Sequence, residues 1–133
     1  MGQQQLLLIV LGVIVVGIAV AIGINIFSES AAQANFDAVM SDMLRIASNA
    51  QQWYMKPTSL GGGGRTFSSV SLTNINTSGS NANGSYSFSN ITGANFDITG
   101  IGNMDGDKDG TPITISLTVY PDSVASTPVI TSR

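Results

Sequence analysis

The sequence predicts an α+β fold in which one long N-terminal helix packs against a small C-terminal antiparallel β-sheet. Residues 1–56 contain no proline and place apolar side chains at helical spacing, whereas residues 66–133 alternate apolar and polar side chains with a period of two. Residues 57–65 lie between the two patterns and include four consecutive glycines. We therefore expect a helix over 1–56, a flexible Gly-rich linker over 57–65 and a β-rich head over 66–133.

The first half of the expected helix, residues 1–28, is apolar on all sides. Residues 6–27 carry no charge and only Asn25 is strongly polar, so this stretch of about 22 residues, at about 1.5 Å per residue, is long enough to cross a bilayer. A secretory signal peptide begins with basic residues, but no Lys or Arg occurs before Arg45. We expect the segment to be retained and Met1 to be the first residue of a chain cut from a short basic leader.

The second half, residues 29–56, is amphipathic. Its apolar residues recur at steps of three and four and define one face of a helix; they are Phe36, Val39, Met40, Met43, Ile46, Ala47, Ala50, Trp53 and Tyr54. Pro57 predicts the end of the helix near Met55 or Lys56, because the ring disfavours helical geometry in the preceding residue. With no proline before Pro57, we expect a continuous helix despite glycines at 12, 17 and 23.

Alternation in the remainder predicts four strands, at 66–72, 85–91, 95–101 and 112–120. The last is the clearest, with Ile113, Ile115, Leu117 and Val119 at every second position. Such alternation is typical of an antiparallel sheet with one buried face, and the amphipathic half of the helix is its expected partner. The polar segment 73–87 is expected to be mostly a solvent-facing loop.

Composition excludes several functions. The 133 residues are enough for one compact domain and include no Cys and no His, so thiol nucleophiles and groups that titrate near neutral pH are absent. We therefore do not expect an enzyme, and no catalytic residue is assigned. Five basic residues and a net charge of −3 also disfavour nucleic-acid binding.

Residues 104–110 (MDGDKDG) are the strongest candidate for a metal site. Asp105, Asp107 and Asp109, with glycines between and after them, match the first half of a calcium loop. The twelfth position is Ser116 rather than Glu, which excludes a full EF-hand, so further ligands would be the carbonyl of Thr111, water, or a carboxylate from elsewhere in the chain. The candidates for that carboxylate are Asp97 and Asp122. The alternative is an acidic turn between two strands; calcium is the only candidate cofactor.

Three sequons make Asn76, Asn83 and Asn90 candidate glycosylation sites. Asp37 and Asp42 lie on the polar side of the helix pattern, and we expect both to be solvated surface charges rather than a catalytic pair.

The opening MGQQQLLLIVLGVIVVG and the amphipathic helix after it resemble the type IV pilin superfamily, which includes pilins, pseudopilins and archaeal pilus and flagellum subunits. The resemblance covers about 55 residues and implies cleavage by a prepilin peptidase, insertion into the inner (cytoplasmic) membrane, and export by a membrane assembly machinery into a homopolymer of many identical subunits at the cell surface. The assembly residues that it implies are Met1, Gln5, Leu6, Leu11, Gly12, Val16, Gly17, Ile22 and Phe27.

One residue departs from the family pattern. Many bacterial members carry Glu at the fifth mature position, where it is thought to pair with a neighbouring N-terminal amine, and here the residue is Gln5. We favour a branch of filament subunits that uses an uncharged contact. The alternative is a minor pilin or a type II secretion pseudopilin acting as a tip, adhesive or secretion component, and a third reading is a membrane-anchored domain that never polymerises.

Overall fold

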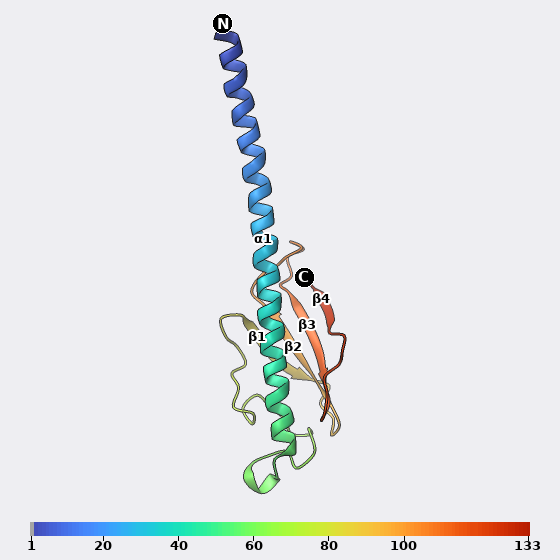
Figure 1. The fold of residues 1–133 in the computed structure, drawn as a ribbon. Helices are drawn as coiled ribbons and strands as arrows, with labels where there is room; N and C mark the ends of the chain where they lie inside the picture. The colour runs from blue at the N-terminus through green and yellow to red at the C-terminus, as the bar shows by residue number, and fades with distance from the viewer. Residues whose placement is uncertain (1) are drawn as a thin grey trace. The chain divides into compact units, whose positions relative to one another are not determined.

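The computed structural model describes residues 2–133 and contains one long helix and four strands (Figure 1). Helix α1 spans Gly2–Met55, and a single turn of 3₁₀ helix, η1, spans Thr58–Leu60. The strands are β1 (Gly84–Ser89), β2 (Phe96–Gly102), β3 (Thr114–Val119) and β4 (Val129–Ser132). The α+β class, the continuity of the helix and its end at Met55 are confirmed. The chain divides into two units after Ala31, and each is described separately below.

The four strands form one antiparallel sheet whose spatial order, β1-β2-β3-β4, follows the chain. Phe88 lies opposite Ile98, and Ile98 lies opposite Leu117, so apolar side chains form a row across three strands. Ser87, Thr99 and Ser116 form the corresponding row on the other face, which is polar. The alternation in the sequence therefore corresponds to one buried and one solvent-facing surface of the sheet.

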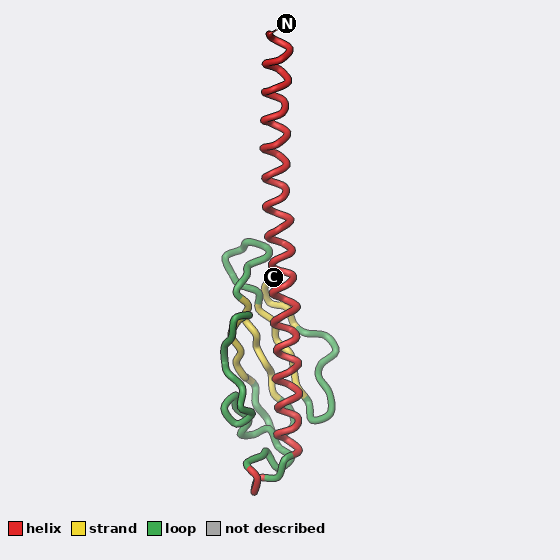
Figure 2. Tube along the Cα trace, turned by 60° about the vertical axis from the view of Figure 1, so that its left-hand side comes forward, coloured by secondary structure: helices red, strands yellow, loops and turns green. Residues whose placement is uncertain are grey.

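Within residues 32–133, the second half of α1 lies against the apolar face of the sheet (Figures 1 and 2). Val39, Met43 and Ile46 are fully buried there. Gly100 on β2 permits a close approach, because a Cβ atom at that position would lie 2.7 Å from Met43 Sδ and 2.8 Å from a methyl carbon of Val39. The predicted amphipathic face is thus the face that α1 buries.

The strand predictions contain two errors. Residues 66–72 form turns rather than a strand, although Phe67 and Val70 are buried. Local bonds compete with a β-ladder here: the Asn74 side-chain amide donates to the Ser69 carbonyl, and the Ser68 N–H donates to Thr66 Oγ1. Strand β4 was not predicted, because it is short and only Ser132 is buried along it. The other three predicted strands are present within a few residues of their expected bounds.

The Gly-rich segment, expected as a flexible linker, is folded onto the end of α1. The Gly63 N–H donates to the Trp53 carbonyl (2.8 Å), and the Arg65 N–H donates to the Tyr54 carbonyl (2.8 Å). Gly61 adopts φ 80° and Gly64 adopts φ 60°, which a residue with a side chain adopts only with strain. The glycines therefore satisfy carbonyls of the last helical turn, in the manner of a C-cap.

We predict that Ile98→Ala lowers the free energy of unfolding by about 2–5 kcal/mol, because the side chain is fully buried and its removal leaves a cavity. Ile101→Ala is the matched control on the same strand: its side chain is 39% exposed, and we expect a loss below about 1 kcal/mol. Thermal unfolding followed by circular dichroism measures both. Equal losses for the two variants would contradict the assigned faces of β2.

Candidate functional site

The most unusual surface of the molecule is the first half of α1. The large apolar side chains at residues 6–27 are each between 53% and 76% exposed. The segment is long and apolar enough to cross a membrane, and none of its most apolar window is buried within the described chain. Water is an unfavourable environment for such a surface, because each large side chain left exposed forgoes about 1.5–3 kcal/mol of burial.

The structure places the expected assembly residues on this one helix, in helical conformation and exposed: Gln5, Leu6, Leu11, Gly12, Val16, Gly17, Ile22 and Phe27. Met1 lies outside the described residues. A Cβ atom added at Gly12 or Gly17 meets nothing within 4 Å, so no contact within residues 2–133 requires glycine at either position.

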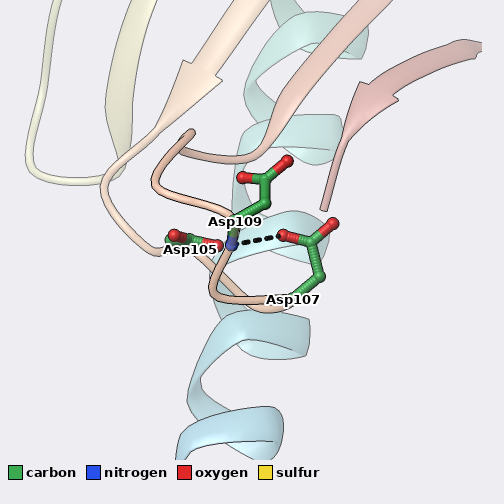
Figure 3. Close-up of side chains that lie close together, drawn as sticks. All are labelled: Asp105, Asp107 and Asp109. Carbon is green, nitrogen blue, oxygen red and sulfur yellow. Dashed lines mark hydrogen bonds between the residues drawn. The ribbon is translucent and has the colours of Figure 1, made fainter.

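The second candidate site is the loop between β2 and β3, which brings Asp105, Asp107 and Asp109 together (Figure 3). One carboxylate oxygen from each residue lies within 4.8 Å of the other two. Asp105 organises the turn, since its two oxygens accept the N–H groups of Lys108 (2.7 Å) and Gly110 (2.8 Å). The carbonyl of Arg133 accepts the N–H groups of Gly106 and Asp107 and thereby anchors the loop to the end of β4.

This donor set suits a hard cation, because carboxylate oxygens are the ligands that calcium prefers. Desolvation acts to raise the pKa of Asp105, but the N–H bonds from Gly110 and Lys108 outweigh it, and the pKa lies below its ordinary value. The other expected ligands are engaged elsewhere. The Thr111 carbonyl accepts the Ser132 hydroxyl, and Asp97 accepts the Thr118 hydroxyl. Neither Asp97 nor Asp122 belongs to the carboxylate group found among the described residues, and calcium binding stays a prediction.

Asp42 is not the solvated charge that the sequence suggested. It is only 17% exposed, and its Oδ2 accepts hydrogen bonds from Asn81 Nδ2 (2.7 Å), Asn83 Nδ2 (2.8 Å) and the Tyr86 hydroxyl (2.8 Å). Arg45 lies 3.6 Å from its other oxygen. Asp42 thus ties α1 to β1 and to the loop before it. Asp37, by contrast, is exposed as expected and accepts a bond from Gln33.

The environment of Asp42 favours its charged form. Burial acts to raise the pKa of this carboxyl, but hydrogen bonds from Asn83, Asn81 and Tyr86 and the charge of Arg45 hold it below the ordinary value of 3.8. Burial and the neighbouring carboxylate also raise the pKa of Tyr86, so its hydroxyl stays a donor at neutral pH. No local pattern could have revealed this cluster, because its members are about 40 residues apart in the sequence.

The three sequons differ in their surroundings. The Asn83 amide donates to Asp42, and the Asn90 amide donates to Asp97 Oδ2 (2.7 Å). Asn76 is exposed in a tight turn at φ 52°, and its side chain has no hydrogen-bond partner among residues 2–133. The structure thus leaves the side-chain amide of Asn76 more accessible than the other two.

We predict that Asp42→Asn destabilises the fold by about 1–3 kcal/mol at pH 7, because the buried Tyr86, the half-buried Asn83 and the exposed Asn81 all lose a charged acceptor. The pKa of Asp42 is lower in the folded state than in the unfolded state. Its carboxylate therefore contributes fully to the stability of the fold above the ordinary pKa, and this contribution is lost as the pH falls through the lower folded-state pKa. Wild type and variant should therefore converge in stability as the pH falls below the folded-state pKa of Asp42. Asp37→Asn is the control, and chemical unfolding from pH 7 to pH 2 is the measurement; a constant difference would contradict the argument.

We predict that Ca²⁺ binds the acidic loop with a Kd of about 0.1–1 mM, the range typical of extracellular calcium modules. About 10 mM Ca²⁺ should then raise the midpoint of thermal unfolding by several degrees in the detergent-solubilised chain. The double variant Asp107→Asn, Asp109→Asn should lose this response, and it keeps Asp105, which organises the turn. An unchanged midpoint for the wild type would leave the acidic turn as the explanation.

Comparisons with protein-family models, with curated proteins and with solved structures returned no match for this chain.

Proposed function

We propose that this chain is the structural subunit of an extracellular type IV pilus-like filament, polymerising through the apolar first half of α1. The observation that carries the proposal is the exposed surface of residues 6–27, an uncharged helix on a chain whose residues 32–133 have their own core. The expected location is a cell-surface filament, with passage through the cytoplasmic membrane before assembly.

Burial of the apolar segment supplies the driving force. Covering its large side chains, at about 1.5–3 kcal/mol each, amounts to tens of kcal/mol relative to water. A bilayer and a bundle of identical helices can both provide this burial. Gly12 and Gly17 favour the bundle, since small residues let neighbouring helices approach closely and nothing within residues 2–133 packs against either position.

The helix start also suits a crowded, dry environment. Gln3, Gln4 and Gln5 are neutral amides that both donate and accept hydrogen bonds, and the first turn of any helix leaves N–H groups without intrahelical partners. A charged side chain buried there would need a paired partner, whereas these amides can satisfy one another and neighbouring backbone groups. This is the uncharged contact that we propose in place of the family's glutamate.

Gln5 also supports a second candidate function. A minor pilin or pseudopilin that caps a filament need not make the usual glutamate contact with every neighbour, and such a subunit would act as a tip, adhesive or secretion component. The two functions differ in the number of identical neighbours around α1, which is many in a major subunit and few in a minor one.

We predict that cells producing the chain release uniform filaments built from it, visible by electron microscopy of the sheared fraction. Leu11→Lys should abolish them, because a lysine within the bundle would be buried without a partner. Leu60→Lys is the matched control: Leu60 is 65% exposed and Leu11 is 57% exposed, but Leu60 lies in η1, outside the apolar segment.

Membrane fractionation separates the competing outcomes. A lysine at the centre of a spanning helix makes membrane insertion less favourable by about 2.5–3.5 kcal/mol. A Leu11→Lys chain that is still found in the membrane fraction has therefore kept insertion and lost assembly. Wild-type protein found only in membranes would favour a simple anchor. Wild-type protein present as a trace component of filaments made of another chain would favour the minor subunit. Either result contradicts the proposal.

A further inference from the structure

An open groove of about 500 Å³ lies beside the C-terminal end of α1. One wall is formed by Asn49, Gln52 and Trp53 of α1, which share a face because they are spaced at i, i+3 and i+4, and by Lys56, which directly follows the helix. The other wall is a tight turn that carries Asn74 and Asn76. All of these residues belong to the unit formed by residues 32–133, so the groove does not depend on how the apolar segment is covered.

The groove is built on fixed backbone. The Trp53 indole N–H donates to the Gly61 carbonyl (3.1 Å), which holds the ring in place, and its side chain is almost fully buried. On the opposite wall, Ile75 is buried, and the Asn74 amide donates to the Ser69 carbonyl (2.8 Å). Both walls are therefore held in place by contacts outside the groove.

Several polar side chains of this groove are exposed and have no partner among the residues that the structure describes. The side chains of Gln52, Lys56 and Asn76 make no hydrogen bond or ion pair with other residues in the range 2–133. The Asn49 amide has only a long contact, 3.5 Å, with Thr77 Oγ1. Amides thus face the groove from both walls, and each offers a donor and an acceptor.

The charges of the lining residues restrict the class of ligand further. Lys56 is the one charged residue among the described lining residues, and none of them is acidic. A single cation is too few for nucleic acid, and a lining without carboxylates does not suit a metal ion. Neighbouring hydroxyl groups, which donate and accept as amides do, together with one anionic group match this lining.

We propose that this groove binds an acidic saccharide, with the amides of Gln52 and Asn76 contacting ring hydroxyls and Lys56 contacting a sugar carboxylate. Trp53 and the neighbouring Ile75 line the groove but are almost fully buried, so the contacts with the sugar are mainly polar. Because the groove is open and shallow, binding is weak, with a Kd of about 1 mM.

Trp53 is the only tryptophan in the chain, so its fluorescence reports directly on the groove. The test titrates trigalacturonate, an acidic trisaccharide, into the detergent-solubilised full chain, and maltotriose serves as the neutral comparison. We expect a saturable change in emission with trigalacturonate and about tenfold weaker binding of maltotriose, since a hydrogen bond to a charged group is lost. Equilibrium dialysis of the same saccharides provides a second readout.

Matched variants locate the binding. Lys56→Gln should remove the preference for the acidic sugar, whereas Lys108→Gln makes the same charge change at a residue that does not line the groove. Gln52→Ala should weaken binding about fivefold to tenfold, whereas Gln33→Ala removes an exposed amide elsewhere on α1. Absence of saturation in both fluorescence and dialysis overturns the proposal. Equal affinity for both saccharides, or equal effects of the groove and control variants, also overturns it.

A saccharide at this groove has a second possible source, namely a glycan attached covalently to Asn76 itself. The titrations therefore use protein made in a host without N-glycosylation, and intact mass of protein from its native cells detects an attached glycan. Ser78→Ala is informative in those cells, because it removes the sequon and keeps the Asn76 amide. Loss of sugar mass in this variant, with no binding of free trigalacturonate by unglycosylated protein, would contradict the proposed site for a free saccharide.

Discussion

The packing of one helix face onto the sheet is the contact on which the rest of residues 32–133 depends. Val39, Met43 and Ile46 from α1 meet Phe96, Ile98 and Ile115 from the strands in one core, to which Phe67 and Val70 from the turns after the helix also belong. A four-stranded sheet of this size has one apolar face and cannot remain in water with that face open. The absence of a side chain at Gly100 allows α1 to lie close to β2, so the helix serves as the second layer of the domain.

The same helix meets two different demands along its length. In its second half the buried positions follow the helical period and most of the remaining positions are polar, Leu44 and Met55 being exposed exceptions, which suits a helix with water on one side. In its first half the side chains are apolar in every direction, and no polar face indicates where water would lie. In the proposed filament, the first halves of neighbouring α1 helices surround one another, whereas the polar residues of the second half stay in water.

Long periodic signals were predictable from the sequence, and contacts between distant residues were not. The end of α1 followed from Pro57, and three strands followed from alternation such as Ile113 to Val119. Residues 66–72 were misassigned because Phe67 and Val70 are buried by a turn, and a turn and a strand can bury similar side chains. The acidic loop was visible as a motif, whereas the role of Asp42 depends on partners about 40 residues away.

The order of the strands has a consequence for folding. Each strand pairs with the one that precedes it in the chain, so no strand must wait for a distant partner before it can join the sheet. The helical face that covers the sheet precedes all four strands in the sequence and is therefore synthesised first. Sequential pairing keeps the sheet contacts local, and closing each short connection costs little conformational entropy. The sheet can therefore grow one strand at a time along an existing helix. This ordering shortens the period during which an unpaired strand edge is open to association with another chain.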